Sequence, residues 1–479
     1  MSSGTRLAQN TLYLTLASVG QKTVAFLYFT MIARFIGVED TGAYFLALAI
    51  VMIILVLDDI GMTSVLIREV ARKNDDAQLW SRTILGVKVI TIPITVAIAF
   101  ILPEVLNYSD TVVTLVRIAT IILVADTISL SFYGVLRGLH KLKYEALGLF
   151  AGQIITAVVG VTLLLSGVAT LPLLVFALAT GSIWNMLFSA SRVIKHTGWR
   201  AMVPTWQMGW KPIKMASAFF MAAAFVKVYS YADSVLLERI MDESAVGLYA
   251  VAYKMTYAFQ FIPLAFVAAL YPTMSAHSKN PAELKRILLN AFWYVSLIGA
   301  PIVFGIWAVA PEVIELFYGA EFAGSALPLQ VLIFVLIFIF LDFPIGSLLN
   351  ATDKQVTKMG IMGVTMVINV VANIFLIPLY GIVGACIAAL ISFTFMFVAG
   401  WIFACPAVKV RVSDLVKSTY KIYLSAIVMA VVVVLVKPIG SILVSIPLGG
   451  IVYVALIFAS GAIRKDHISA GWSMLTKRG

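Results

Sequence analysis

Apolar segments long enough to cross a bilayer recur from one end of the chain to the other, and this limits the possible folds more than any other feature. A transmembrane helix needs about 20 predominantly apolar residues, because each residue adds only about 1.5 Å. The chain is 62% hydrophobic and 12% charged, whereas soluble proteins have about 45–50% apolar and about 25% charged residues. The sequence therefore predicts an all-α, polytopic membrane protein.

The apolar segments predict about fourteen transmembrane helices. They are expected at residues 10–33, 41–67, 82–102, 111–136, 145–166, 170–190, 212–236, 245–270, 287–310, 325–349, 356–378, 381–404, 415–436 and 441–463. The loop between the sixth and seventh spans is long and rich in Trp, which is typical of a linker in the membrane interface. We therefore expect an N-lobe at residues 1–190, a cytoplasmic linker at 191–211, a C-lobe at 212–404, and two extra helices with a cytoplasmic tail at 405–479.

Lysine and arginine residues gather in every second loop, and this asymmetry predicts the orientation of the spans. With the N-terminus inside, the outer loops contain only Arg34, Arg239 and Lys437. Positively charged loops resist translocation, so we expect both termini in the cytoplasm and the chain in the plasma membrane. Contact with anionic membrane lipids explains the net charge of +11, and nucleic acid is not expected as a partner.

A pattern in the first span returns at the same spacing in the seventh. Its members in the first copy are Lys22, Arg34, Gly42 and Tyr44, and in the second copy Lys227, Arg239, Gly247 and Tyr249. Each copy would contain six spans, so both copies have the same orientation. The sequence thus predicts two pseudo-symmetric six-helix lobes around a central cavity, related by an axis along the membrane normal.

Lys22 and Lys227 lie near the centres of their predicted spans. A charge at that depth costs at least a few kcal/mol, and each ammonium is about 18 Å from the outer interface, too far for its side chain to reach. Either both lysines line a hydrated cavity and attract an anion such as phosphate, or each forms a buried structural pair with a carboxylate. Lys254, on the eighth span, is a further candidate for the cavity.

Four acidic residues in spans are candidates for counter-charges or for ion coupling. Asp126 and Asp233 either neutralise the two lysines or provide a proton or Na⁺ site. Asp58 and Asp59 are adjacent, so at most one can face a cavity. Each carboxylate disfavours the charge of the other, which suits a proton carrier.

The other cations in or near spans have simpler explanations. Lys88, Arg117 and Lys421 are close enough to a span end for their charges to reach the interface. Arg34 and Arg239 are at the outer ends of the first and seventh spans, each followed by acidic loop residues. They form either an interfacial cap or an outer gate.

Motifs of soluble enzyme chemistry are absent from the sequence. There is no Walker loop, no HExxH and no Cys/His spacing typical of a metal site. We therefore expect no catalytic residues, no metal centre and no cofactor, apart from coupling to H⁺ or Na⁺.

The stretch ARFIGVEDTGAY and the later VLIREVAR resemble motifs of a known family. A span that ends in A-R-x-x-G, an acidic pair, and G-x-Y at the start of the next span are similar to those of the O-antigen-type oligosaccharide (polysaccharide) flippases. These belong to the multidrug/oligosaccharidyl-lipid/polysaccharide exporter superfamily. The inner-loop sequence GVLRGLHKLKYE after the fourth span resembles the same family.

The resemblance implies that the chain moves a lipid-linked oligosaccharide on a polyprenyl or dolichyl phosphate carrier to the outer leaflet. It implies alternating access, with cell-surface polysaccharide or glycan biosynthesis as the purpose and glycan assembly proteins as partners. The basic cavity residues of the family match Lys22 and Lys227. One alternative is a cation-coupled drug or metabolite exporter of the same superfamily, which would favour an acidic cavity. Another is a membrane glycan polymerase or ligase, which would need a larger outer loop.

Overall fold

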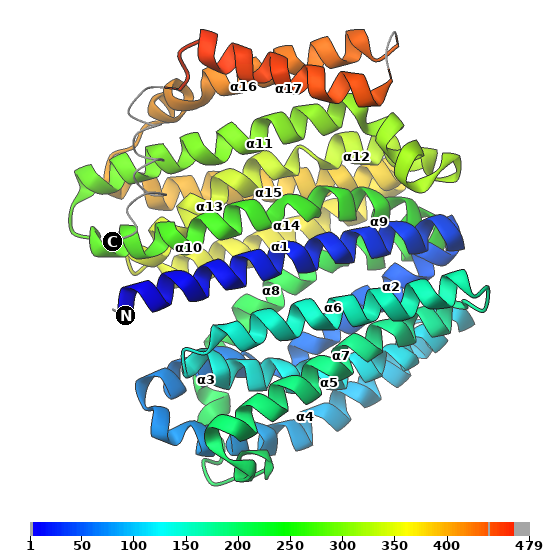
Figure 1. The fold of residues 1–479 in the computed structure, drawn as a ribbon, viewed down its shortest axis with the longest axis vertical. Helices are drawn as coiled ribbons and strands as arrows, with labels where there is room; N and C mark the ends of the chain where they lie inside the picture. The colour runs from blue at the N-terminus through cyan, green and yellow to red at the C-terminus, as the bar shows by residue number, and fades with distance from the viewer. Residues whose placement is uncertain (1–2, 439–440, 464–479) are drawn as a thin grey trace. The chain divides into compact units, whose positions relative to one another are not determined.

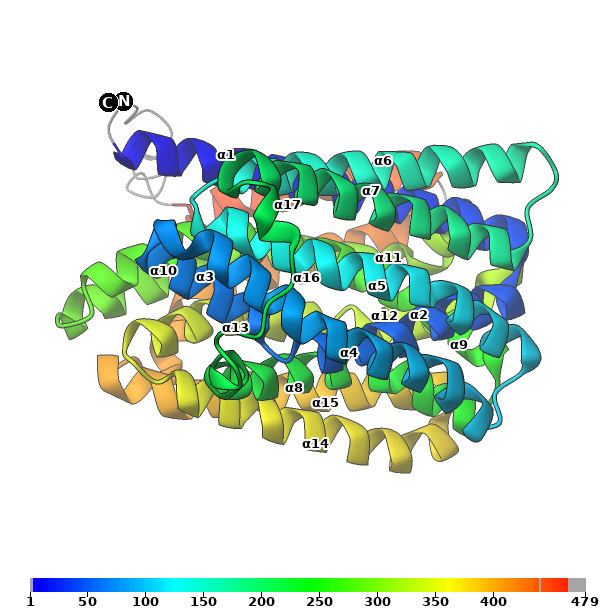
Figure 2. The same ribbon diagram turned by 90° about the horizontal axis from the view of Figure 1, so that it is seen from below.

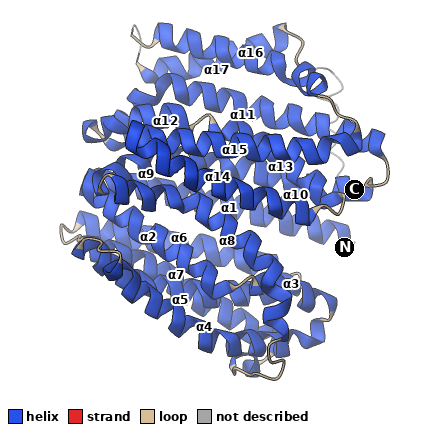
Figure 3. Cartoon of the chain, turned by 180° about the vertical axis from the view of Figure 1, so that it is seen from behind, coloured by secondary structure: helices blue, strands red, loops and turns tan. Residues whose placement is uncertain are grey.

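The computed structural model describes residues 3–438 and 441–463, and Figure 3 shows helices and loops but no strand among them. The helices are α1 (Ser3–Ile36), α2 (Val38–Asp59), α3 (Met62–Arg72), α4 (Ala77–Val105), α5 (Asp110–Gly138), α6 (Leu142–Leu165), α7 (Leu171–Thr197), α8 (Lys211–Ile240), α9 (Glu243–Tyr257), α10 (Phe261–Ala276), α11 (Pro281–Tyr318), α12 (Ala326–Leu332), α13 (Val335–Ala351), α14 (Gln355–Tyr380), α15 (Ile382–Ala404), α16 (Val412–Val436) and α17 (Ile442–Ala459). The predicted all-α class is confirmed.

Every predicted span coincides with one helix or with two consecutive helices. Within the described residues, 11 helices are long and apolar enough to cross a bilayer. Two consecutive segments, Ala320–Leu332 and Val335–Ala351, are bent by 41° relative to each other and would make a twelfth if they form one span. The other two predicted spans are α1 and the pair α9–α10. They are helical, but α9 and α10 are each short and Lys22 and Arg34 interrupt the apolar sequence of α1.

The predicted span 41–67 is broken into α2 and α3. Ile60 and Gly61 both have positive φ, of 47° and 74°, which ends the helix in a left-handed turn. A Cβ on Gly61 would lie only 2.6 Å from the backbone nitrogen of Phe220 in α8. Gly61 therefore permits both the turn and the close approach of α8.

Contacts divide the chain into two compact units. The first unit comprises Met1–Phe261 and Met362–Ala388, and the second comprises Ile262–Ile361 and Ala389–Gly479. The first therefore includes α1–α9 and most of α14. These units are defined by contacts within the fold and not by the repeat in the sequence. They therefore do not test the predicted lobe boundaries at residues 190, 211 and 404, which stay a prediction.

In the first unit, α4, α5, α6 and α7 lie side by side and α1 runs along α6 (Figures 1 and 2). The short helix α3 is amphipathic and buries Met62, Val65 and Leu66 in a cluster with Phe132 and Tyr133 of α5. This packing fixes α2, α3 and α5 around the polar residues described below.

In the second unit, α11 packs along α16, and α16 pairs with α17 (Figure 1). Lys285 forms an ion pair with Asp414 at 2.6 Å, near one end of α11. Lys437 forms another with Glu312 at 2.9 Å, near the other end. These two ion pairs hold α11 and the end residues of α16 in register.

The connection between α7 and α8 is held against α4. Gln78 donates to the carbonyl of Thr197 at 2.7 Å, and Ser81 donates to the carbonyl of Ala201 at 3.1 Å. Trp199 and Trp210 remain exposed. A fixed segment with exposed Trp side chains fits the predicted linker in a membrane interface.

Gly42 and Gly247, which occupy equivalent positions in the two copies of the repeat, pack against each other where α2 meets α9. A Cβ on Gly42 would lie 2.9 Å from the nitrogen of Gly247, and one on Gly247 would lie 3.1 Å from the nitrogen of Gly42. Each would also collide with a carbonyl of the opposite helix, that of Glu243 or Val38. Equivalent residues that contact each other are expected on an axis between two related copies.

We expect Gly42→Leu to lower the free energy of unfolding by about 1–3 kcal/mol, because the added side chain forces α2 and α9 apart. The measurement is thermal unfolding of the purified protein in detergent. Gly450→Leu is the control, since a Cβ there meets nothing within 4 Å. Equal midpoints for the Gly42 variant and the unaltered protein would refute the close contact.

Candidate substrate cavity and charge clusters

A cavity of about 300 Å³ lies in the first unit, among α1, α2, α5, α6, α7 and α9. Its walls combine aromatic rings, amides, hydroxyls and two opposite charges. The lining residues are Gln21, Ala25, Tyr28, Phe29, Tyr44, Leu48, Met52, Ile122, Asp126, Leu149, Gly152, Gln153, Thr156, Leu178, Gly181, Ser182, Asn185 and Lys254. A concave site with a few polar groups on apolar walls is typical of small-molecule binding.

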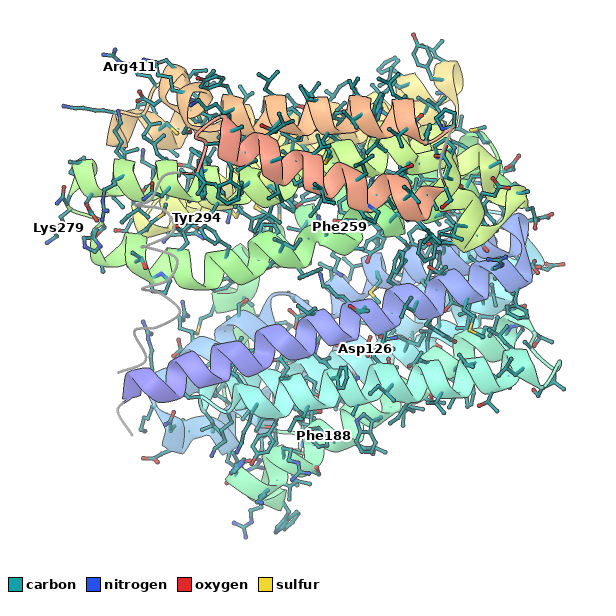
Figure 4. The ribbon with its side chains drawn as sticks, turned by 45° about the horizontal axis from the view of Figure 1, so that its top comes forward. Asp126, Phe188, Phe259, Lys279, Tyr294 and Arg411 are labelled. Carbon is teal, nitrogen blue, oxygen red and sulfur yellow. The ribbon has the colours of Figure 1, made fainter. Side chains whose placement is uncertain are left out.

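Asp126 on α5 provides the negative charge of this cavity, and Figure 4 shows it between α1 and α6. Ser182 of α7 makes a hydrogen bond with its carboxylate. Lys227 of α8 is close enough for the two charges to attract each other, but no ion pair between them is recorded in the described residues. The ammonium of Lys227 is 5.5 Å from the ring centroid of Tyr231. Asp126 is thus a counter-charge near Lys227 without binding it directly.

Lys254 on α9 provides the positive charge of the cavity. Its ammonium lies 5.2 Å from the ring centroid of Phe29 and 5.4 Å from that of Phe45. Ring faces attract a cation through their quadrupole, so the two phenylalanines hold the ammonium in place. Among the described residues no carboxylate forms an ion pair with it, which leaves its ammonium available to a ligand.

Lys22 is half-buried on α1. The residues of α1 that line the cavity include Gln21, Ala25 and Tyr28, which follow one face of the helix. Lys22 is adjacent to that face and is not among the lining residues. No hydrogen bond or ion pair is recorded for its ammonium within the described part of the chain. The expectation that Lys22 and Lys227 act as a pair stays a prediction.

Asp58 is the counter-charge of Lys88, and this corrects the expectation that Lys88 reaches the interface. Lys88 is 1% exposed, and its ammonium is 2.6 Å from the Asp58 carboxylate. It also donates to Thr127 at 2.8 Å, and Thr127 donates to the same carboxylate. A buried charge needs a partner and further hydrogen bonds, and this arrangement provides both. Asp58 therefore does not face the cavity.

Asp59 has a local role at the start of α3. Its carboxylate accepts hydrogen bonds from the hydroxyl of Thr63 at 2.6 Å and from the backbone nitrogen of Thr63 at 3.3 Å. Such bonds satisfy amide groups that the first turn of a helix leaves free. The structure brings Asp59 to neither lysine.

Asp233 on α8 lies at the centre of a buried polar cluster. Its carboxylate accepts hydrogen bonds from the hydroxyl of Tyr249 at 2.7 Å and from the amide of Asn373 at 2.6 Å, and Asn369 makes a further one. No cation is recorded beside Asp233 among the described residues. The side-chain carbonyl oxygens of both asparagines are buried and lack a donor. The cluster thus brings together several side-chain oxygens, and no positively charged side chain is recorded beside them in the described residues.

Arg34 and Arg239 both lie at exposed helix ends. Arg34 is near the end of α1 and Arg239 near the end of α8, where its guanidinium is 5.5 Å from the ring centroid of Tyr108. This position fits an interfacial cap, and an outer gate stays a prediction. Arg117 pairs with Glu104, and Lys421 donates to the carbonyl of Ser460 at 2.6 Å.

Sequence reasoning missed the neutral polar residues of both sites. Gln21, Gln153 and Tyr28 line the cavity, and Asn369 and Asn373 contact Asp233. The two asparagines are four residues apart in an apolar segment, which places them on one helix face. That spacing is the signal in the sequence that could have identified the two asparagines as partners of Asp233.

The chain is similar to known proteins along most of its length. The family model described as "Polysaccharide biosynthesis protein" matches residues 7–278, and the model described as "MatE" matches residues 218–375. A relative from Haloferax volcanii, named probable low-salt glycan biosynthesis flippase Agl15, is 23% identical over 389 residues. This alignment covers 81% of the chain and 81% of the relative.

Two solved structures have the same fold. One is the lipid II flippase MurJ in an inward closed conformation, with a TM-score of 0.79, 18% identity, and coverage of 95% of this chain and 100% of that one. The other is an inward-facing multidrug resistance MATE family transporter of the MOP superfamily, with a TM-score of 0.67 and 14% identity. This match covers 83% of this chain and 96% of that one.

Proposed function

The chain belongs to the polysaccharide biosynthesis protein family, and we propose that it is a flippase for a lipid-linked oligosaccharide. It moves the glycan, on a polyprenyl or dolichyl phosphate carrier, from the inner to the outer leaflet by alternating access. The observation that carries this proposal is the cavity with Lys254, a cation without a carboxylate partner among the described residues, in a chain whose relative is named as a glycan biosynthesis flippase. The protein acts as a transporter and not as an enzyme.

Lys22 and Lys227 bind the phosphate or diphosphate of the carrier, and Lys254 binds the part of the head group that enters its cavity. A compact ammonium on a flexible stem suits phosphate as a point charge. The polyprenyl tail remains in the lipid, because removing so much apolar surface from water is favourable. This division explains how a headgroup crosses a bilayer while its tail never leaves it.

We place the chain in the plasma membrane with both termini in the cytoplasm. The distribution of Lys and Arg among the loops supports this orientation. The glycan is then completed on the inner side and used on the outer side, by assembly proteins on each side.

A cell that lacks the chain tests the function. We expect the lipid-linked glycan to accumulate in the inner leaflet and the surface glycan to be lost. If the chain were instead a polymerase or ligase, the cell that lacks it would still move the lipid-linked glycan normally, and only the polymer length would change. That second outcome would refute the proposal.

The match to the MatE model favours one second candidate, a cation-coupled exporter of drugs or metabolites. A cationic drug would prefer a cavity without a free ammonium, and Lys254 argues against it. Growth of the same cell on cationic drugs distinguishes the two, because only the exporter predicts greater sensitivity.

The Asp233 cluster is the candidate for ion coupling. A hard cation such as Na⁺ takes oxygen ligands, and Asp233, Asn369 and Asn373 offer a carboxylate with two carbonyl oxygens that lack a donor. A proton on Asp233 is the alternative. Ionisable residues inside the membrane without a cation beside them commonly mark ion pathways.

We expect Asp233→Asn to abolish the stimulation of transport by an imposed Na⁺ or proton gradient, because the neutral amide can neither hold the cation nor release a proton. The measurement is initial transport rate in liposomes with each gradient applied in turn. Asp75→Asn, at an exposed position, is the control. Unchanged stimulation in the Asp233 variant would exclude this cluster as the coupling site.

A further inference from the structure

Tyr28 lines the cavity, and its hydroxyl is buried against Gly160 of α6 without a hydrogen-bond partner. Tyr28 on α1 is 4% exposed, and no donor or acceptor is recorded for its hydroxyl. A Cβ on Gly160 of α6 would collide with this hydroxyl, so glycine leaves the space that the phenol occupies. A buried polar atom without a partner is costly, and the side chain that carries this one lines the cavity.

Two amide side chains line the same cavity. No hydrogen bond is recorded for Gln21 on α1 or Gln153 on α6 among the described residues. An amide provides both donors and acceptors, and a phenol provides one of each. Together with the ring of Tyr44, these groups offer hydrogen bonds at the edges and an apolar face, which matches a hydroxyl-bearing sugar ring.

The charges and the size of the cavity also favour a sugar. A phosphate bound inside would face the carboxylate of Asp126, whereas an uncharged ring with hydroxyls can accept hydrogen bonds from Lys254 and donate to Asp126. The volume of about 300 Å³ is at the lower end of the range for ligand sites, about 300–1,000 Å³. It corresponds to about ten waters, so it suits one or two sugar rings and not a whole oligosaccharide.

We infer that this cavity is a binding subsite for one sugar unit of the lipid-linked glycan, separate in chemistry from the lysines that bind its phosphate. The inference rests on the proposed function. Tyr28, Gln21 and Gln153 then determine how well the flippase recognises a glycan, while Lys22 and Lys227 recognise the carrier.

The test compares two probes in liposomes that contain the full chain: a polyprenyl phosphate that carries a single hexose, and the same polyprenyl phosphate without sugar. Tyr28→Phe removes one hydroxyl and Gln153→Leu removes one amide, each with little change in volume. We expect each to weaken binding of the hexose probe about tenfold and to leave binding of the sugar-free probe unchanged. Tyr108→Phe is the matched control, because its hydroxyl is equally buried and unpartnered but lies outside the cavity.

The outcomes separate this inference from the proposed function. If Tyr28→Phe and Gln153→Leu bind both probes as the unaltered protein does, the cavity does not recognise sugar and the inference is overturned, although the flippase proposal stands. Equal weakening of both probes would also overturn it, because that result indicates a structural role. If the unaltered chain binds and moves neither probe, the proposed function itself fails.

Discussion

Replacing both Lys22 and Lys227 by alanine is expected to abolish export of the lipid-linked glycan while the amount of folded protein stays the same. Each hydrogen bond to a charged group contributes about 1.5–3 kcal/mol, so the loss of two corresponds to at least a hundredfold lower rate. Lys→Arg at either position retains part of the activity, because the charge remains but the shape of the donor changes. The measurement is surface glycan per folded protein.

Lys279→Ala is the control for this pair, since Lys279 is exposed in the connection between α10 and α11 (Figure 4). It should export as the unaltered chain does. The structure sharpens the expectation for Lys227, which has a carboxylate nearby in Asp126 but no direct ion pair recorded with it. Normal export by the double alanine variant would refute the role of these lysines.

Asp58→Ala is expected to destabilise the protein by about 3–5 kcal/mol, because it leaves Lys88 charged and buried without a partner. We expect loss of monodisperse protein in detergent and a lower thermal midpoint. The double variant Asp58→Leu with Lys88→Met should recover much of the stability, since an apolar pair often replaces a buried ion pair at little cost.

Asp76→Ala is the matched control for the buried pair. Asp76 pairs with Lys73 at 3.1 Å, but the side chains are 66% (Lys73) and 37% (Asp76) exposed, and pairs that reach solvent contribute only about 0–1 kcal/mol. A thermal midpoint for Asp58→Ala that equals that of Asp76→Ala would contradict the buried triad of Asp58, Lys88 and Thr127.

The sequence predicted the helices well because bilayer thickness sets the length of each apolar segment. It could not predict the break at Ile60 and Gly61, since hydropathy carries no information on the sign of φ. The sequence identified Gly42 and Gly247 as equivalent positions of the repeat, and the structure shows them in contact. A repeat is visible in the sequence as a fixed spacing of residues, whereas the position of a turn depends on local steric contacts.

The charges were predicted less well than the helices. Lys88 was expected at the interface because distance to a span end was the one criterion available, and its partner Asp58 is on another helix. The hydrogen-bond partners of Asp233 were not predicted for the same reason, because Tyr249 and Asn373 approach it from α9 and α14. Partners on different helices are decided by packing, which a single sequence does not report.

The most direct measurement of the central claim uses the purified chain in liposomes whose inner leaflet is loaded with a lipid-linked oligosaccharide. A lectin added outside reports each glycan that reaches the outer leaflet. We predict rapid exposure with the unaltered chain, and exposure no faster than in protein-free liposomes with the double alanine variant of Lys22 and Lys227. Equal rates for the two proteins, or no exposure with the unaltered chain, would contradict the account.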